Sequence, residues 1–471
     1  MLHVSTRGEA PAIGFTDALL AGLARDGGLY LPERWPALAP ETIAGFAGRP
    51  YAEVAKAVLG PLVDGDIAAP DLGRMIDDAY SGFRHPAVCP LVQLDANLFA
   101  LELFHGPTLA FKDVAMQLLG RLMDHVLTAR GQRATIVGAT SGDTGSAAAE
   151  AFKGLDHMDV FILYPHGRVS DVQRRQMTGV GAPNVHAIAL EGTFDDCQAI
   201  VKGLFNHARF RDELQLSGVN SINWARVAAQ IVYYFTAAVA LGAPHRAVSF
   251  SVPTGNFGDI LAGWAAKRMG LPVARLMIGT NANDILARTL ESGTYETRGV
   301  APTTSPSMDI EVSSNFERLL FEACGRDAGA VRRLMGSLAQ RGAFTIDPAP
   351  LARIRAEFSA QAVDEPAVRD EMTATQKAAG YTLDPHTAVG ARAARALLAE
   401  DPGTPVVALA TAHPAKFPDA VARATGLHPK LPPHLDDLLH RPERFTPLPN
   451  DQSAIERFIR ERARVPQGAA A

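Results

Sequence analysis

Short runs of β-branched and other apolar residues alternate with longer alanine- and leucine-rich segments from about residue 98 onward. Short apolar runs are typical of buried strands, whereas the longer segments have the spacing of helices. Because strands that alternate with helices form βαβ units, the pattern predicts an α/β fold with two open lobes of mostly parallel sheet. The expected strands are 134–140, 159–165, 185–190, 247–253, 274–279 and 406–411, and the expected helices are 145–153, 194–206, 257–269, 283–292 and 416–424.

The segments on either side of this alternation have a different pattern. Residues 1–90 combine helical segments with proline-containing loops, which predicts an N-terminal extension. We expect a smaller α/β lobe at 91–215 and a larger one at 216–430, the latter with a helical insertion at about 310–400. The tail, 431–471, is rich in proline and polar residues and ends in an alanine run, so a frayed end is expected.

Composition and charge agree with a folded chain of several domains. Of its 471 residues, 47% are hydrophobic and 20% are charged, which excludes the composition of a disordered protein. The formal net charge of -5 provides no cationic surface for nucleic acid or for an anionic membrane. The sequence therefore predicts a protein without nucleic-acid or membrane partners, in which any anionic ligand is held by a local site.

The sequence also indicates a cytoplasmic location. The most apolar long segment, 227–243, is interrupted by Gln230 and Thr236, which predicts a buried core helix rather than a membrane span. The first residues lack the pattern of a signal peptide. The three cysteines lie far apart and form neither a metal-binding pair nor a disulfide framework, as is usual in a reducing compartment.

Several familiar catalytic motifs are absent, including G-x-G-x-x-G, G-x-x-x-x-G-K-[ST], H-E-x-x-H and G-x-S-x-G. Metal-dependent chemistry is not expected. The remaining candidate is Lys112, which follows a strand-like run, the turn 105–108 and Phe111. An amine at such a strand-to-helix junction is desolvated, which lowers its pKa and favours the neutral form that makes a Schiff base. The alternative is a solvated lysine paired with Asp113.

Two glycine-containing turns lie between an expected strand and an expected helix. Residues 141–145 (SGDTG) leave backbone N–H groups uncovered at a helix start, where a substrate carboxylate can bind. Residues 253–259 (PTGNFGD) have the same position after another strand and can hold a phosphate. The alternatives are an ordinary helix cap at the first turn and a generic loop at the second.

A third candidate position is the end of the strand in VVALATAHPAKF. Ligands of open α/β sheets bind beyond the carboxyl ends of the strands, so the Thr411 hydroxyl can face a ring nitrogen of a cofactor. His413 and Lys416 follow shortly after it. A threonine that hydrogen-bonds to the next turn is the alternative.

Together these segments resemble the threonine synthase family, whose members are pyridoxal-phosphate (PLP) enzymes of fold type II, the tryptophan-synthase-β type. Several long blocks in the family's order are far more specific than one short motif. The resemblance covers the chain up to about residue 430, and its blocks are STRG, DGGLYLPE, HGPTLAFKD, ATSGDTGSAA, NSINWAR, PTGNFGD, SSNFERLLFE, DPHTAVG and ATAHPAKF.

The resemblance implies a role for each candidate position. Lys112 is similar to the lysine that holds PLP as a Schiff base, and Thr411 to the hydroxyl opposite the pyridine nitrogen, which would leave that nitrogen largely unprotonated. The positions similar to the phosphate-binding loop are Gly255, Asn256, Phe257, Gly258 and Asp259, and those similar to the substrate-carboxylate loop are Ser141, Gly142, Asp143 and Thr144.

The implied reaction is the conversion of O-phospho-L-homoserine and water to L-threonine and phosphate, by γ-elimination followed by β-hydration, as the last step of threonine biosynthesis. Such a substrate brings a third anion, for which Arg226 and Lys416 are the first candidates and Arg7 the third. Each could also be a solvated surface charge. A monomer or homodimer acting on a small molecule is expected.

Other readings remain open from the sequence. One is a related PLP lyase, such as a serine/threonine dehydratase or an O-phosphohomoserine phospho-lyase. Another is a binding protein that kept the fold and lost the cofactor, and a third is a nucleotide-binding protein that uses the two glycine turns.

Overall fold

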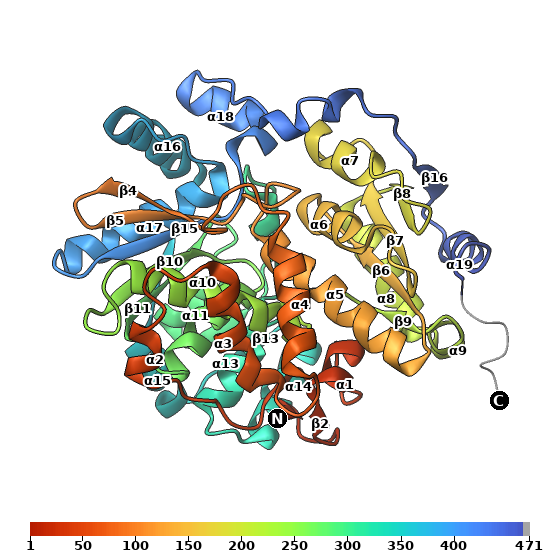
Figure 1. Cartoon of the computed structure of the whole chain (residues 1–471), viewed down its shortest axis with the longest axis horizontal. Coiled ribbons are helices and arrows are strands. Elements are labelled where there is room, and N and C mark those ends of the chain that lie inside the picture. Colours follow the sequence, from red (N-terminus) through yellow and green to blue (C-terminus); the bar gives the residue numbers. More distant parts are fainter. Residues whose placement is uncertain (465–471) are drawn as a thin grey trace.

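The computed structural model describes residues 1–464, which form two lobes built on separate sheets (Figure 1). The larger sheet has the strand order β14-β11-β10-β15-β5-β4, in which only the β4–β5 pair is antiparallel. Its strands are β4 (Leu91–Asp95), β5 (Leu98–Glu102), β10 (Val248–Pro253), β11 (Val273–Thr280), β14 (Phe358–Ala362) and β15 (Val406–Ala410).

The sheet of the smaller lobe is entirely parallel, with the order β16-β8-β7-β6-β9. Its central strand, β7, is buried along its whole length, as expected for a mainly apolar run, and its one charged residue, Asp159, is paired with Arg464. The strands are β6 (Ala134–Ala139), β7 (Met158–Pro165), β8 (Val185–Glu191), β9 (Leu216–Ser217) and β16 (Thr446–Pro449).

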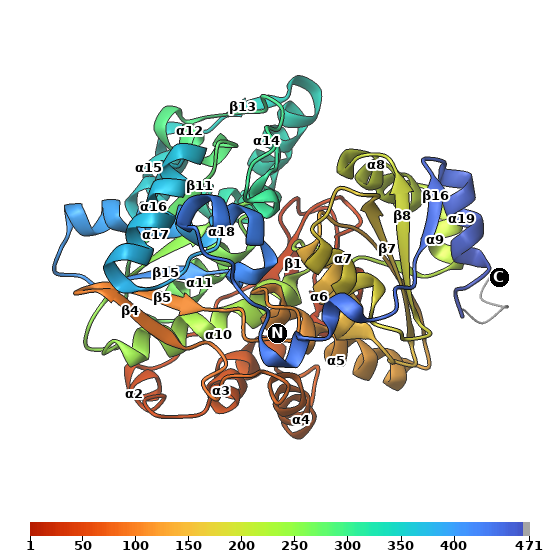
Figure 2. The same cartoon turned by 90° about the horizontal axis from the view of Figure 1, so that it is seen from above.

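Helices cover both faces of the larger sheet (Figure 2). The buried helix α10 (Trp224–Ala240) packs with α11 (Gly258–Arg268) on one side. On the other side, α17 (Pro385–Glu400) lies against β10, β11 and β15, and α16 (Glu365–Ala379) packs on α17. Helix α5 (Lys112–Arg130) contacts both α10 and α6 (Asp143–Phe152), so it connects the two lobes.

The smaller elements complete the two lobes. The N-terminal extension contains the antiparallel strands β1–β3, and its helices α3 and α4 pack on α10 and α5. The remaining elements are β1 (Leu2–Ser5), β2 (Ile13–Gly14), α1 (Phe15–Ala21), β3 (Tyr30–Pro32), α2 (Pro40–Ala44), α3 (Tyr51–Val63), α4 (Ala69–Tyr80), α7 (Asp171–Thr178), α8 (Phe194–Asn206), α9 (Ala208–Glu213), α12 (Ile285–Ser292), β12 (Thr294–Glu296), η1 (Pro306–Met308), α13 (Phe316–Ala323), α14 (Ala328–Arg341), β13 (Ala343–Thr345), α15 (Pro348–Glu357), η2 (Pro414–Lys416), α18 (Pro418–Thr425), η3 (Pro433–Leu435), η4 (Leu438–His440) and α19 (Gln452–Arg460).

The predicted α/β class with mostly parallel sheets is confirmed. Each of the six predicted strands is present with bounds within one residue, and each of the five predicted helices with bounds within two. The apolar segment 227–243 is largely the buried helix α10, as expected. Within residues 1–464, no helix combines the length and hydropathy needed to cross a membrane.

The course of the chain through the lobes differs from expectation in three places. Strands β4 and β5, expected in the smaller lobe, belong to the larger sheet, because β5 pairs with β15 along its apolar length. The segment 310–400, expected as a helical insertion, also contributes to the core of the larger lobe, because β14 pairs with β11 and α17 packs on the sheet. The tail returns to the smaller lobe, where β16 pairs with β8 and α19 packs on α8 (Figure 1). The predicted frayed end, 465–471, lies outside the described residues.

Candidate active site

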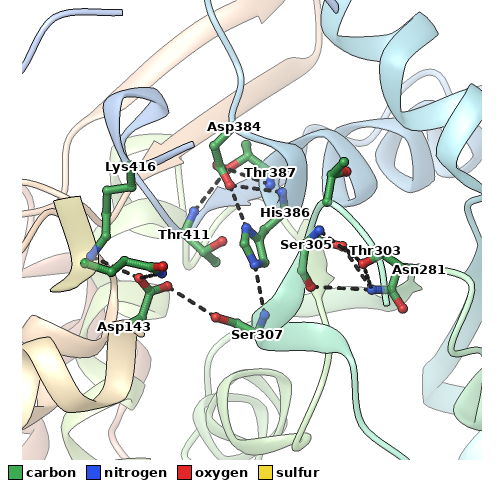
Figure 3. Close-up of polar contacts among 12 residues, drawn as sticks. Asp143, Asn281, Thr303, Ser305, Ser307, Asp384, His386, Thr387, Thr411 and Lys416 are labelled. Atoms are coloured by element: carbon green, nitrogen blue, oxygen red, sulfur yellow. Dashed lines mark hydrogen bonds and ion pairs between the residues drawn. The ribbon is translucent and has the colours of Figure 1, made fainter. Parts of the chain in front are cut away.

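Loops from both lobes meet at the carboxyl ends of β5, β6, β10 and β15. Lys112 begins α5, and Asp143 begins α6 directly after the loop that follows β6. Lys416 lies in η2, shortly after β15. Lys112 and Lys416 both contact Asp143. Figure 3 shows Asp143 joined to Ser307, and Ser307 joined to His386 at the N-terminus of α17. The predicted lysine thus lies in a buried polar cluster between the lobes.

Lys112 is buried, with only 9% of its side chain exposed. Its Nζ lies 3.3 Å from Asp143 Oδ2, 3.3 Å from Ser307 Oγ and 4.8 Å from the centre of the Phe111 ring. Asp113, the partner in the solvated-lysine alternative, instead accepts hydrogen bonds from the backbone N–H and the hydroxyl of Thr108. The alternative is therefore wrong for this lysine.

The surroundings of Lys112 favour its neutral amine. Burial lowers the pKa of Lys112, and the charges of Lys416 and Arg226 lower it further. Asp143 opposes these effects, but the net shift is downward. An amine that loses its proton more easily than an exposed lysine is suited to nucleophilic and acid–base chemistry.

Asp143 is the counterion of two lysines. Its Oδ1 lies 2.9 Å from Lys416 Nζ and accepts a hydrogen bond from Gln173 Nε2, also at 2.9 Å. Burial alone would raise the pKa of Asp143, but Lys416 and Lys112 outweigh burial and hold it well below its usual range. Lys416 is fully buried and also donates to the Thr108 carbonyl at 2.7 Å. The Asp143 carboxylate is therefore ionised.

The start of α6 is a tight glycine turn without a side-chain cap. Gly142 precedes the helix with φ of 141° and caps it with no side-chain hydrogen bond. A Cβ on Gly142 would lie within 2.3 Å of the Gln173 side chain, so only glycine fits. Thr140 holds the turn, since its hydroxyl accepts from the N–H groups of Gly142 and Gly145.

The second glycine turn packs closely against the segment of Ser307. A Cβ on Gly255 would lie 2.9 Å from the Ser307 carbonyl oxygen, whereas one on Gly258 would meet nothing closer than 3.5 Å. Phe257 adopts a left-handed conformation with φ of 62° directly before α11 begins at Gly258. The Asn256 carbonyl accepts from the backbone N–H of Asn315, which fixes the turn.

Asp259, in the first turn of α11, is directed toward α10. Its carboxylate accepts hydrogen bonds from the hydroxyls of Tyr233 and Tyr234, and burial raises its pKa to about 6. Tyr234 also donates to the Asp259 carbonyl. These contacts tie the start of α11 to α10 and so hold the glycine turn in place.

Thr411 follows β15 and is buried at 5% exposure. Its backbone N–H donates to Thr387 Oγ1 at 3.1 Å, and its carbonyl accepts from Phe111 N–H. Its hydroxyl makes no hydrogen bond to any residue that the structure describes. This backbone pairing places Thr411 beside the residue preceding Lys112.

The two arginine candidates differ in their partners. Arg226 is 4% exposed and donates to the Val219 carbonyl, and within residues 1–464 it forms no ion pair. Burial lowers its pKa to about 10. Arg7, by contrast, pairs with Glu317 at 3.0 Å. The charge of Arg226 is therefore without a counterion among the described residues, whereas the charge of Arg7 is balanced by Glu317.

Sequence reasoning missed Ser307, Gln173 and His386. His386 lies within the block DPHTAVG, which carried the resemblance but suggested no role for this residue. Ser307 lies in a short segment without a distinctive motif and is 195 positions from Lys112. Only the fold brings these residues to the lysine.

These residues fit pyridoxal phosphate. A buried amine with a lowered pKa lies between the two glycine turns, and the Thr411 hydroxyl lacks a partner among the described residues. At Gly255 the backbone packs too closely against Ser307 to admit a Cβ. The helix start that follows this turn can hold the phosphate of the cofactor.

Comparison with known proteins agrees with this geometry. Three family models match: "Threonine synthase N terminus" at residues 2–80, "Pyridoxal-phosphate dependent enzyme" at 85–349 and "Threonine synthase, C-terminal" at 387–459. The last match extends through most of the tail, which the sequence resemblance left out after about residue 430.

Individual relatives match over almost the whole chain. Threonine synthase of Pseudomonas aeruginosa is 52% identical over 460 residues, which cover 98% of each chain. The crystal structure of PLP-bound threonine synthase from Brucella melitensis is 63% identical, covering 99% of this chain and 100% of its own, with a TM-score of 0.96. The yeast enzyme structure is 39% identical, covering 98% of both chains, with a TM-score of 0.93. The chain therefore belongs to the threonine synthase family of PLP-dependent enzymes.

Proposed function

We propose that this chain converts O-phospho-L-homoserine and water to L-threonine and phosphate, and so completes threonine biosynthesis. The observation that carries the proposal is the buried Lys112 amine between the two glycine turns, in a chain of this family. The test is incubation of the PLP-loaded protein with O-phospho-L-homoserine. Equal amounts of threonine and phosphate are expected, whereas 2-oxobutyrate as the main product would indicate a lyase that stops before hydration.

In this proposal Lys112 carries the cofactor and moves protons at its Nζ. Bound PLP supplies an electron sink that stabilises negative charge on the carbons next to the substrate amino group. The Lys112 amine would be the group that accepts a proton from the substrate and later returns it, and its lowered pKa suits it to both transfers. Its burial between the lobes keeps bulk water away from these transfers.

The other proposed contacts follow from the loops around Lys112. The turn of Gly255, Asn256, Phe257, Gly258 and Asp259 holds the cofactor phosphate at the start of α11, with Asp259 acting through its bonds to α10. The buried Thr411 hydroxyl, which has no partner among the described residues, would face the pyridine nitrogen. The loop of Ser141, Gly142, Asp143 and Thr144 binds the substrate carboxylate at the start of α6, through backbone N–H groups other than that of Gly142, which donates to Thr140.

The glycine turn provides a first prediction. Gly255→Ala is expected to weaken PLP binding by about tenfold or more, because its Cβ would lie 2.9 Å from the Ser307 carbonyl and force the two segments apart. Gly60→Ala in α3 is the control, since its Cβ would meet nothing within 4 Å and it lies outside the turn. Titration of each cofactor-free variant with PLP measures the effect. Equal affinities in both variants and the parent would remove this turn from the phosphate site.

We propose that Arg226 holds the substrate phosphate. A buried guanidinium without a counterion favours the arrival of an anion, whereas Lys416 is already paired with Asp143. Lys416 remains the second candidate, because its charge contributes to the same cluster.

Arg226→Ala is accordingly expected to raise KM for O-phospho-L-homoserine by about 10- to 100-fold, since a hydrogen bond to a charged group is lost. Affinity for PLP should change little. Arg7→Ala is the control, because Arg7 is paired with Glu317. A KM that rises for Arg7→Ala and not for Arg226→Ala would reverse the assignment.

The cellular setting is part of the proposal. We propose that the protein acts in the cytoplasm, on the basis of its separate cysteines, and that it is a monomer or homodimer. Light scattering of the purified PLP-loaded protein measures the oligomeric state, and a larger assembly would contradict this part.

A further inference from the structure

Ser307 is a second neighbour of the Lys112 amine. Its hydroxyl donates to Asp143 Oδ2 at 3.2 Å, and since a hydroxyl has one proton, its oxygen can only accept from Lys112 Nζ at 3.3 Å. Lys112 Nζ also lies 3.3 Å from Asp143 Oδ2. A neutral amine has two N–H groups and one lone pair, so two acceptors leave the lone pair facing away from both. Ser307 and Asp143 together therefore set the direction of that lone pair.

The position of Ser307 depends on His386, at the start of α17. Ser307 N–H donates to His386 Nε2 at 3.2 Å, and His386 Nδ1 lies 2.9 Å from Asp384 Oδ1 (Figure 3). Because the carboxylate accepts from Nδ1–H, the ring presents Nε2 without a proton, as an acceptor for Ser307. Asp384 also accepts from the backbone N–H groups of His386 and Thr387, which fixes the carboxylate itself.

A second contact holds the same segment from the opposite side. Asn281 Nδ2 donates to the side chains of Thr303, Ser305 and Asp309 at 2.8–2.9 Å, and both Asn281 and Ser305 are fully buried. The segment that carries Ser307 is therefore held by Asn281 as well as by His386 (Figure 3).

We propose that Ser307 is a further catalytic residue, which directs the lone pair of the Lys112 amine, and that Asp384 and His386 are positioning residues that hold Ser307 in place. This inference rests on the proposed role of Lys112. The charged and titratable groups around that amine are Asp143 from α6, Lys416 from η2, Arg226 from α10, Asp259 from α11 and, next to Asp143, His386 from α17.

The test is a double-mutant cycle of Ser307→Ala and His386→Leu, with two measurements. The first is kcat and KM of the PLP-loaded enzyme. The second uses the cofactor-free protein and follows, by mass spectrometry, how the rate of acetylation of Lys112 by acetic anhydride depends on pH. The second measurement does not involve the reaction, so it separates a failure of this inference from a failure of the proposed function. Ser251→Ala, which removes a buried serine hydroxyl bonded to the Gly390 carbonyl, is the matched control.

Each single variant should lower kcat by about 10- to 100-fold, with KM within about threefold of the parent, because the lost contact is to the amine and not to the substrate. Each should also move the midpoint of Lys112 labelling to lower pH, since an acceptor for the ammonium form is lost. The double variant should be no worse than either single variant, because both act on one contact. His386→Gln, which keeps an acceptor toward Ser307, should restore most of kcat.

The proposal is overturned if Ser307→Ala matches Ser251→Ala in both kcat and labelling midpoint. It is also overturned for His386 if the two single effects multiply in the double variant, because His386 would then act on something other than Ser307. If His386→Leu does not fold, His386→Phe takes its place in the cycle with Ser307→Ala, because it keeps a ring against Phe417 and has no acceptor, and a multiplied effect has the same meaning.

Discussion

Lys112→Ala is expected to lower turnover of O-phospho-L-homoserine by about 10³-fold or more, because one side chain both attaches the cofactor and moves the protons. The fold should persist, since the truncation lies at the start of α5 and removes no large apolar group. Borohydride reduction followed by peptide mapping should find PLP on Lys112 of the parent protein. Phosphate and threonine release measure the loss of turnover.

Lys56→Ala is the control for this experiment. Lys56 forms an exposed pair with Asp77, so its removal should leave both turnover and PLP attachment unchanged. If the Lys112 variant still forms threonine at the parent rate, or if the reduced cofactor is found on Lys416, the nearest buried lysine of the cluster, then Lys112 is not the cofactor-bearing residue.

The central strands were predictable because each is a short, mainly apolar run between turn residues. Strand β15 (VVALA) is buried at every position and could not be mistaken for a surface segment. The edge strands have no such signal. Strand β14 (FSAQA) contains polar residues, and β16 (TPLP) contains two prolines, which are compatible only with an edge. Their membership in a sheet is decided by the neighbouring strand, which local sequence does not specify.

The candidate site likewise has residues that the local sequence predicts and residues that it does not. Lys112 and the two glycine turns stand out because their chemistry is local: an amine at a helix start, and small residues between a strand and a helix. The partners of Lys112 are set by tertiary contacts. Asp143 is predictable as a helix-start residue but not as the counterion of two lysines, because that role depends on burial and on Lys416 from the other lobe.

The role of Asp143 as a shared counterion leads to a prediction about stability. Asp143→Asn is expected to lower the free energy of unfolding by about 3–5 kcal/mol at pH 7, since it leaves two buried lysines without a compensating charge. Denaturant unfolding of the cofactor-free protein measures it. Asp77→Asn is the matched control, because the exposed Lys56–Asp77 pair should contribute less than about 1 kcal/mol.

The pH dependence of this difference follows from the signs of the pKa shifts. Burial raises the pKa of Asp143, but Lys416 and Lys112 lower it by more, so the net shift in the folded protein is downward. The stability that Asp143 contributes to the parent is therefore fully present above the unfolded pKa of about 4 and is lost as pH falls through the lower folded pKa. In the variant, burial lowers the pKa of Lys112 without the opposing charge of Asp143. As pH rises toward about 10, the folded variant loses the Lys112 proton before the unfolded variant does, so the stability of the variant rises with pH. The difference in the free energy of unfolding between parent and variant therefore narrows. A gap below about 1 kcal/mol at pH 7, or one that widens toward pH 10, would mean that other groups neutralise the two lysines.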